Sequence, residues 1–312
     1  MSQEHKDAIA ANLKAFDTRM ATKYDTLEPV NALSILSTKT LLEFDVNKPR
    51  KTTEESAPLL GNPSKPLVGF TLDDLPELTT FREKFPDSVF RPGMKLLDFA
   101  CGTGLVTMKL PPYLAEKGKT TEIVGIDINP KLLSIFNDKA EKHISEEVSI
   151  KSYIYDILDP ELQLELSAKF GGKFDAIICT ISYHHIDSYR EVTKKLAEFL
   201  APGGWLFIVD FYNEDVEKDI PAEKAGNAVR HMGGLKVDAL NETLGSFSGL
   251  TNVSAAREFC VKLWQPDIFI ENHSRQDIVD KMKSGDLESK NVNGDITYLV
   301  DNSIIIAVGQ KS

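Results

Sequence analysis

The segment from Met94 to Gly104, MKLLDFACGTG, joins an acidic side chain and two glycines to the end of a short apolar run. The run predicts a buried strand, and the glycines predict a tight turn that lets a nucleotide-like ligand approach bare backbone. Asp98 stands where the strand ends. Because a carboxylate can only accept hydrogen bonds or pair with a cation, this position favours a ligand with an ammonium group over a phosphate.

The spacing of the small residues indicates whether the turn suits a dinucleotide or another adenosine ligand. A dinucleotide-binding turn reads GxGxxG or GxGxxA, and its last small residue lets the helix and strand pack closely. Thr107 stands at that position here, which disfavours NAD and leaves a dehydrogenase as the outside alternative. The acidic and small residues alternate instead, at Asp98, Ala100, Gly102 and Gly104.

A second carboxylate ends the next apolar run, Glu122 to Asp127. A vicinal diol offers two donors and a carboxylate two acceptors, so Asp127 suits the hydroxyls of a ribose. Ile128 would then lie against the adenine. The alternative is that Asp127 caps the helix expected from Pro130.

The runs that follow end in further candidates. Asp156 and Ile157 close the third run, where a turn-forming aspartate is almost equally expected. After the fourth run, which includes Cys179, come Tyr183, His184 and His185. A neutral histidine there could take a proton from an attacking nucleophile, although at least one of the pair is expected to hold a structural hydrogen bond. Adjacent histidines without a nearby third ligand disfavour a metal site.

Two more polar positions come later in the chain. Asp210 and Tyr212 end the fifth run, facing either a pocket or solvent. His231 precedes a pair of glycines and is either a substrate-side histidine or a loop anchor.

Elements of alternating type must position these residues. Strands are predicted at 94–99, 122–127, 149–156, 174–181 and 205–211, and helices at 104–117, 130–142, 160–168 and 187–200. Alternation at this pitch is typical of an α/β fold with a doubly wound, mostly parallel sheet. Residues 252–264 are predicted as a loop with weak helical character, and a final strand at 303–310 would add an antiparallel edge.

The remaining segments divide the chain into three parts. Residues 1–44 contain two amphipathic stretches, at 8–20 and 30–44, and predict an N-terminal helical cap. Residues 45–90 are rich in Pro, Gly, Lys, Thr and Ser up to residue 67 and predict a linker or insertion with a short helix near 78–85. Residues 91–312 are predicted to form the ligand-binding domain, with a polar helical insertion at about 215–247.

Together these motifs resemble the class I S-adenosylmethionine-dependent methyltransferases, whose first motif reads D/E-x-G-x-G-x-G. The resemblance spans about residues 90–265 and implies a seven-stranded Rossmann-like sheet. Within the class, it is to the small-molecule methyltransferases that are type 11/12-like. Ala100 replaces the first glycine, and we expect its methyl group to be tolerated. The implied cofactor-binding residues are Asp98, Ala100, Gly102, Gly104, Asp127, Ile128, Asp156, Ile157 and Cys179, with Asp156 meeting the adenine amino group.

The same resemblance extends to other segments. Leu200-Ala-Pro-Gly-Gly204 matches a turn that leads into the fifth strand. Phe16 to Asp25 is similar to an element that lies over the cofactor in methyltransferases of quinone biosynthesis, so Tyr24 could stack near the sulfonium or offer its hydroxyl. The implied catalytic residues are therefore Tyr24, His184, His185 and His231.

Composition restricts the partners. The net charge is −11, and the sequence lacks the clustered Lys and Arg residues that binding of nucleic acid requires. No apolar run is long enough to span a bilayer, and the polar N-terminus does not resemble a secretion signal, so we expect a cytoplasmic protein. The three cysteines, Cys101, Cys179 and Cys260, have no metal or disulfide spacing and are expected to be reduced.

Methyl transfer from a sulfonium is an in-line displacement that mainly requires positioning, which is worth about 7–11 kcal/mol in favourable cases. The sequence therefore predicts an S-adenosylmethionine-dependent methyltransferase acting on a small-molecule acceptor. The alternatives are a methyltransferase of protein side chains, or a cofactor-binding interaction protein without catalysis. The acceptor atom and the oligomeric state are left open.

Overall fold

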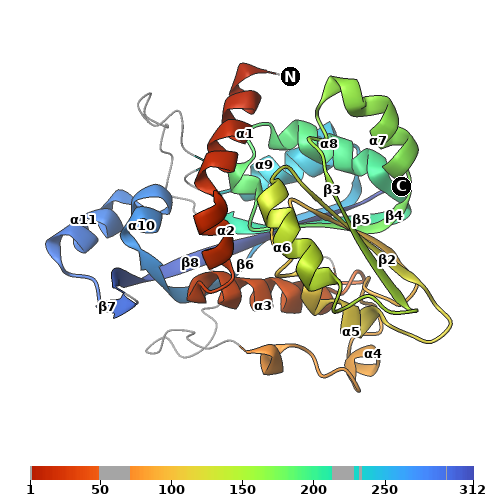
Figure 1. The fold of residues 1–312 in the computed structure, drawn as a ribbon, viewed down its shortest axis with the longest axis horizontal. Helices are drawn as coiled ribbons and strands as arrows, with labels where there is room; N and C mark the ends of the chain where they lie inside the picture. Colours follow the sequence, from red (N-terminus) through yellow and green to blue (C-terminus); the bar gives the residue numbers. More distant parts are fainter. Residues whose placement is uncertain (1, 49–70, 213–227, 232–233, 293) are drawn as a thin grey trace.

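The protein folds around one eight-stranded sheet covered by helices on both faces (Figure 1). The computed structural model describes residues 2–48, 71–212, 228–231, 234–292 and 294–312. The strands are β1 (Lys95–Phe99), β2 (Thr121–Asp127), β3 (Val148–Ile154), β4 (Phe174–Thr180), β5 (Leu200–Tyr212), β6 (Thr251–Pro266), β7 (Ser289–Val292) and β8 (Asp295–Gln310).

The strand order is β3-β2-β1-β4-β5-β8-β6, with β7 paired to β8. The first five strands are parallel, whereas β8 runs antiparallel to β5, β6 and β7. The order reverses between β1 and β4, and in open α/β sheets ligands bind outside the carboxyl ends of the strands at such a point. The turns after β1 and β4 are therefore expected to form the site.

Two hydrophobic clusters hold the helices to the sheet. On one face, α3 (Glu28–Leu42), α4 (Phe81–Lys84), α5 (Pro111–Leu114) and α6 (Pro130–Ala140) contribute side chains. On the other, α7 (Gln163–Phe170), α8 (Tyr189–Phe199) and α9 (Val237–Glu242) do so. Figure 1 shows α7, α8 and α9 on the opposite side of the sheet from α3 and α5. The expected doubly wound fold is confirmed.

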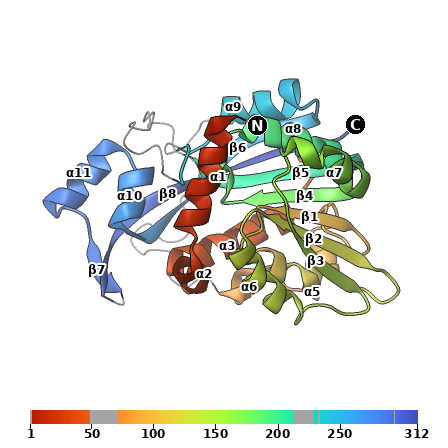
Figure 2. The same ribbon diagram turned by 45° about the horizontal axis from the view of Figure 1, so that its top comes forward.

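The C-terminal part contains elements that the sequence did not reveal. Residues 252–264, predicted as a loop, form most of the long strand β6, and β8 begins eight residues before the predicted start at 303. Bulges within β6 interrupt the alternation that marks a strand. The ends of β6 and β8 extend beyond the parallel strands and, with β7, α10 (Asp267–His273) and α11 (Gln276–Ser284), form a C-terminal projection (Figure 2). The strand β7 makes the sheet eight-stranded rather than seven-stranded.

Other predicted helices differ in extent. The helix expected at 104–117 is wrong as a single helix, because it is divided into a 3-10 turn, Thr107–Lys109, and the short α5. Pro111 and Pro112 lack N–H donors and are tolerated only in the first turn of a helix, so the chain starts a new helix, α5, at Pro111. The predicted helix at 160–168 similarly begins as a 3-10 turn, Pro160–Leu162, before α7.

The N-terminal region forms three helices rather than two: α1 (Gln3–Ala15), α2 (Thr18–Tyr24) and α3. The break between α1 and α2 falls at Asp17, whose side chain accepts from the N–H of Met20 and caps α2. Most of the predicted linker, residues 49–70, lies outside the described residues, as does much of the insertion expected at 215–247. The described part of that insertion contains α9 and a π-helical turn, Thr243–Phe247. No helix in the described ranges is both long and apolar enough to cross a membrane.

Candidate active site

The turn after β1 has the backbone conformation of a ligand-binding loop. Ala100, Gly102 and Gly104 have φ values of 56°, 53° and 78°. A Cβ on Gly104 would lie 2.7 Å from Phe136 Cδ2, whereas a Cβ on Gly102 would meet nothing within 4 Å. Gly104 is thus required for packing against α6, while Gly102 leaves its backbone open to a ligand.

Ala100→Gly is expected to stabilise the protein by about 0.5–1 kcal/mol. The substitution removes the strain of an alanine in the left-handed region, and the greater conformational entropy of glycine in the unfolded chain cancels only part of that gain. Urea unfolding would measure the change. The control is Ala168→Gly on the exposed face of α7, which should destabilise by about 0.5–1 kcal/mol. A loss of stability in both variants would show that the strain at Ala100 is absent.

Asp98 ends β1 as a nearly buried carboxyl group, 2% exposed. One oxygen, Oδ2, accepts from the hydroxyl of Thr107. The other, Oδ1, has no hydrogen-bond partner among the residues that the structure describes. Burial, opposed by the Thr107 hydrogen bond, raises the pKa of Asp98 to about 7. Such an oxygen is suited to a ligand group that donates and carries positive charge.

Asp127 ends β2 beside the same turn and organises it. Its Oδ2 accepts from the N–H of Gly102 at 2.8 Å, and its Oδ1 accepts from the N–H of Asn129 at 2.8 Å. Burial raises the pKa of Asp127 despite these bonds. The alternative that Asp127 caps the next helix is wrong, since Asn129 caps α6 by accepting from the N–H groups of Lys131 and Leu132.

These residues fit S-adenosylmethionine. The unpartnered oxygen of Asp98 would hold the ammonium group, the open backbone at Gly102 would lie along the cofactor, and Asp127 retains lone pairs for the ribose hydroxyls. Ile128 is half-buried next to Asp127, where an adenine ring could lie.

The other predicted cofactor residues lie close by but differ in accessibility. Asp156 accepts from the N–H of Leu158 at 3.0 Å, which is the turn-forming role considered as an alternative, and its Oδ2 lies 3.0 Å from His5 Nε2. The side chains of Ile157 and Cys179 are each 1% exposed and lie in the hydrophobic cluster shared with α7 and α8. Their part in binding stays a prediction, and any contact would be apolar.

The N-terminal helices α1 and α2 lie across the carboxyl ends of the parallel strands (Figures 1 and 2). Polar contacts tie them to several strands in turn. His5 reaches Asp156 after β3, and Asn12 Nδ2 donates to the carbonyl of His185 after β4 at 3.4 Å. The carbonyl of Phe16 accepts from Asn129 Nδ2 at 2.9 Å. The helical cap therefore covers the edge where the glycine turn and the histidines lie.

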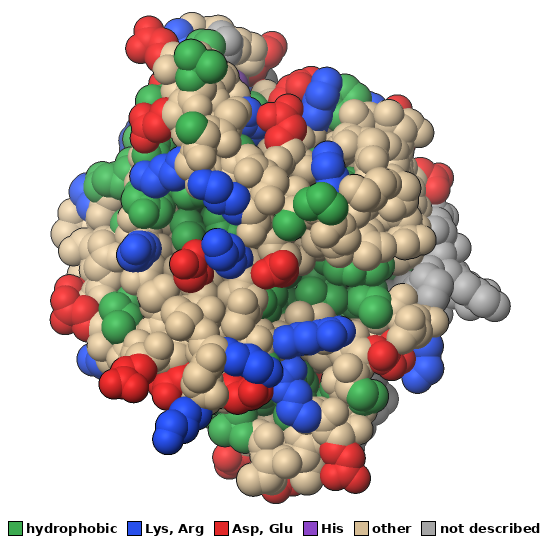
Figure 3. All heavy atoms as spheres, turned by 90° about the vertical axis from the view of Figure 1, so that its right-hand side faces the viewer, with side chains coloured by type: hydrophobic (Ala, Val, Ile, Leu, Met, Phe, Trp, Pro, Cys, Tyr) green, Lys and Arg blue, Asp and Glu red, His purple; other side chains and the backbone are tan. Residues whose placement is uncertain are grey.

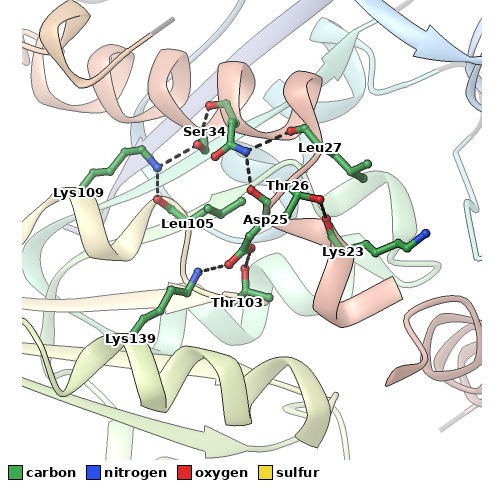
Figure 4. A network of polar contacts seen from close by, with 10 residues as sticks. Lys23, Asp25, Thr26, Leu27, Ser34, Thr103, Leu105, Lys109 and Lys139 are labelled. Carbon is green, nitrogen blue, oxygen red and sulfur yellow. Dashed lines mark hydrogen bonds and ion pairs between the residues drawn. The ribbon is translucent and has the colours of Figure 1, made fainter. Parts of the chain in front are cut away.

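Asp25, directly after α2, joins this cap to the glycine turn (Figure 4). Its Oδ1 accepts from the hydroxyl of Thr103 at 2.5 Å, and its Oδ2 pairs with Lys139 of α6 at 2.7 Å. A second lysine, Lys109, donates to Ser34 of α3 at 3.0 Å. The N-terminal segment is thus fixed directly to the loop that would hold the cofactor.

Asp25→Asn is expected to speed cofactor release by about tenfold, because it removes a half-buried ion pair and weakens a charge-assisted hydrogen bond, together worth about 1–2 kcal/mol. Stopped-flow displacement of bound S-adenosylhomocysteine would measure the rate. Asp45→Asn, which removes the more exposed pair with Lys48, is the control and should leave the rate unchanged. Equal release from both variants would contradict a role of Asp25 in holding the cap.

Tyr24 lies in this cap, half-buried and edge-on to Phe16 with ring centroids 5.7 Å apart. Burial and the charges of Asp25, Asp127 and Asp210 raise the pKa of Tyr24 to about 12. Its hydroxyl stays protonated at neutral pH, so Tyr24 can donate a hydrogen bond or present its ring but does not act as a base.

His184 and Asp210 form a buried pair where β4 and β5 end. His184 Nδ1 lies 2.7 Å from Asp210 Oδ1, and Nδ1 must be the donor because a carboxylate only accepts. The N–H of His184 also donates to Asp210 Oδ2 at 3.2 Å. Burial alone would raise the pKa of Asp210, but the charge and hydrogen bonds of His184 lower it. An aspartate that fixes the tautomer of a histidine is the arrangement of a general base.

The other two histidines have different environments. His185 Nδ1 donates to the carbonyl of Ala228 at 3.0 Å, and burial, with the neighbouring His184, lowers the pKa of His185 to about 3. It is therefore neutral, a hydrogen-bond acceptor at Nε2 and a weak base. His231 Nε2 donates to the carbonyl of Ile186 at 3.0 Å, and burial lowers the pKa of His231. That bond is the loop anchor considered as the alternative.

Two further residues lie near the site: Tyr212, which the sequence predicted to face a pocket or solvent, and Arg257, which gave no signal in the sequence. Tyr212 ends β5 with 3% of its surface exposed and lines a cavity of about 360 Å³ beside the C-terminal projection. Arg257 of β6 lies over the Tyr212 ring, with its guanidinium carbon 5.5 Å from the ring centroid. Only an alternating pattern across 252–264 would have pointed to Arg257, and the bulges obscured it. Among the described residues, no cluster of side chains suits a metal ion.

Comparison with known proteins agrees with this geometry. A family model described as a methyltransferase domain matches residues 74–254. An uncharacterized methyltransferase of Schizosaccharomyces pombe is 28% identical over 309 residues, covering 98% of this chain and 99% of the relative. The ubiquinone/menaquinone biosynthesis C-methyltransferase of Wigglesworthia glossinidia brevipalpis is 31% identical over 120 residues, 38% of this chain and 44% of that protein.

Solved structures of methyltransferases and related proteins resemble this chain at lower sequence identity. The YcgJ protein of Bacillus subtilis has 17% identity and a TM-score of 0.47, covering 71% of this chain and 93% of that one. The Haemonchus contortus phosphoethanolamine N-methyltransferase 2 in complex with S-adenosyl-L-methionine has 13% identity and a TM-score of 0.44, covering 71% of this chain and 49% of that one. Because the family model spans more than half of the chain, this protein belongs to the class I S-adenosylmethionine-dependent methyltransferase family.

Proposed function

We propose that this protein transfers a methyl group from S-adenosylmethionine to a small-molecule acceptor. The observation that carries the proposal is the unpartnered, buried Oδ1 of Asp98 beside the open glycine turn, at the point where the strand order reverses. The cap formed by α1 and α2 supports a small acceptor, because a protein side chain would require an open groove over the same edge.

Some residues of the chain would bind the cofactor, and others would take part in proton transfer. S-adenosylmethionine, when bound, supplies a methyl group on a good leaving group. Asp98 and Asp127 would orient it, and the cap would exclude water from the reacting groups. Asp210 holds the His184 ring with Nδ1 as donor, so a proton leaving an oxygen or nitrogen acceptor would be taken at Nε2. His185 and Tyr24 would orient the acceptor.

Calorimetry with S-adenosylmethionine and S-adenosylhomocysteine tests the cofactor. Both should bind, and Asp127→Ala should weaken both by about tenfold or more, because it removes the ribose acceptor and frees the N–H of Gly102. Asp175→Ala, at the amino end of β4, is the matched control. Binding of neither ligand to the intact protein would overturn the proposal.

Methyl-tritiated S-adenosylmethionine, incubated with a cell extract and the protein, tests the acceptor class. Label should appear in the small-molecule fraction. Label in the protein fraction instead would favour the methyltransferase of protein side chains. Cofactor binding without transfer to either fraction would favour an interaction protein without catalysis.

A further inference from the structure

The cavity of about 360 Å³ at the end of β5 has a cationic lining in an acidic protein. Three of its lining residues carry positive charge, and one carries negative charge: Arg257, Lys262, Arg275 and Asp301. The net charge of the whole chain is −11, and acidic and basic side chains are interspersed on the face at the far end of the sheet (Figure 3). The cavity lining therefore carries more positive than negative side chains in a chain whose net charge is negative.

Arg257 is the cation in this lining that no carboxylate of the described structure neutralises. Lys262 pairs with Asp301 at 3.4 Å, and Arg275 pairs with Asp277 at 2.9 Å. The Nε and Nη2 atoms of Arg257 both donate to the neutral hydroxyl of Ser303. These bonds fix the orientation of the guanidinium without compensating its charge, and donors remain on Nη1.

The neighbouring thiol does not supply the missing negative charge. Cys260 lines the same cavity, and burial raises the pKa of the Cys260 thiol even with Arg257 beside it. The thiol is therefore neutral at physiological pH. Arg257 thus presents a half-buried, oriented positive charge to the cavity, a setting in which an anion is bound more strongly than at an exposed arginine.

Aromatic and aliphatic side chains form the rest of the lining. Phe211, Tyr212, Phe269, Ile278 and Leu299 are among them. Phe211 connects the cavity to the proposed reaction centre, because its ring lies edge-on to His184 at 5.2 Å and to Phe269 at 5.4 Å. An occupant that contacts Arg257 and the Phe211 ring would therefore be separated from His184 by that one ring.

We propose that the methyl acceptor is an anion, a carboxylate or phosphate attached to an apolar ring or chain, whose charged group binds Arg257 in this cavity. The inference rests on the proposed methyltransferase function. The volume is at the small end of the range for ligand pockets, which suits a single ring or a short chain. The apolar body lies against Phe211 and Tyr212 and places the group to be methylated toward His184.

Three probes of similar size test the charge requirement: benzoate, phenyl phosphate and benzyl alcohol. Calorimetric titration in the presence of S-adenosylhomocysteine should give at least one anion an affinity about tenfold or more above that of benzyl alcohol. The tighter of the two anions identifies the head group. Arg257→Gln should abolish this preference, and Arg257→Lys should retain part of it. Arg190→Gln, which alters an arginine outside the cavity that is paired with Glu242, is the matched control and should retain it all.

The outcomes separate this inference from the proposed function. Unchanged affinity of Arg257→Gln for S-adenosylhomocysteine shows that the variant is folded. If S-adenosylhomocysteine binds but neither anion binds better than benzyl alcohol, or if Arg257→Gln keeps the preference, the anionic acceptor is overturned and the methyltransferase proposal stands. If S-adenosylhomocysteine does not bind at all, the proposed function fails, and the inference falls with it.

Discussion

Asp98→Asn is expected to stabilise the cofactor-free protein at neutral pH and to weaken its binding of S-adenosylmethionine. Asp98 is 2% exposed, its Oδ1 has no partner among the described residues, and its pKa is raised to about 7. Ionising it in the folded protein therefore costs free energy that only a cationic ligand group offsets. The asparagine removes the charge and can still accept from the hydroxyl of Thr107.

The direction of the pH dependence follows from the raised pKa. In the unfolded chain an aspartate titrates near pH ~3.9, whereas folded Asp98 titrates near 7. The stabilising effect of its proton is complete below pH ~4 and is lost as the pH rises through 7. The variant should therefore match the wild type below pH ~4 and exceed it above pH 7 by about 1–3 kcal/mol. Denaturant unfolding at several pH values would measure this difference.

Ligand choice makes the binding half of this prediction specific. S-adenosylmethionine should bind the variant about 10–100-fold more weakly, because a charge-assisted bond to its ammonium group is lost. Methylthioadenosine has the same nucleoside and no amino-acid tail, so its affinity should not change. Equal weakening of both ligands would show that Asp98 acts by shaping the turn instead. Asp175→Asn serves as the control for both measurements.

The sequence revealed those parts of the fold whose signal is local. Strands β1 to β5 and helices α6 and α8 were recognisable because each has an apolar run or helical periodicity of its own. The strand β6 was missed because its bulges, one of them between Arg257 and Phe259, change which face successive side chains occupy. The C-terminal projection depends on pairing between β6, β7 and β8, which no local window contains.

The candidate site divides in the same way. Asp98 and Asp127 were identified because they stand where strands end, a position visible in the sequence. The expectation that Ala100 is tolerated depended on whether its φ is positive, and only the fold reveals that its φ is 56°. His185 was considered a base, but burial lowers its pKa to about 3. The pairing of His184 with Asp210, and the place of Arg257 beside Tyr212, depend on which strands are neighbours.

Asp210→Asn is expected to slow methyl transfer about 100-fold or more, if the acceptor loses a proton, and to lower stability by about 3 kcal/mol. Asp210 is fully buried, and its two oxygens accept from His184 and from the N–H of Phe211. An asparagine presents an amide N–H₂ toward one of these donors. This contact between two donors is removed if His184 changes its tautomer. The change would place a proton on Nε2, the atom that would act as the base.

Folding and chemistry can be separated for this variant by pH. The folded pKa of Asp210 is lowered, so its stabilisation is present above pH ~4 and is lost as the pH falls below that value. The stability difference between Asp210→Asn and wild type should therefore shrink in acid. The tritium-transfer rate should depend on pH differently in Asp210→Asn and in wild type, because the variant changes which ring nitrogen of His184 carries the proton.

Asp187→Asn, which breaks the ion pair with Arg230 near the same turn, is the matched control. It should reduce stability while preserving the pH profile of methyl transfer. Nitrogen-15 spectra of the histidine rings would report the tautomer of His184 directly. A profile in Asp210→Asn that has the wild-type shape, with His184 still protonated on Nδ1, would mean that Asp210 only supports packing and that the acceptor needs no base.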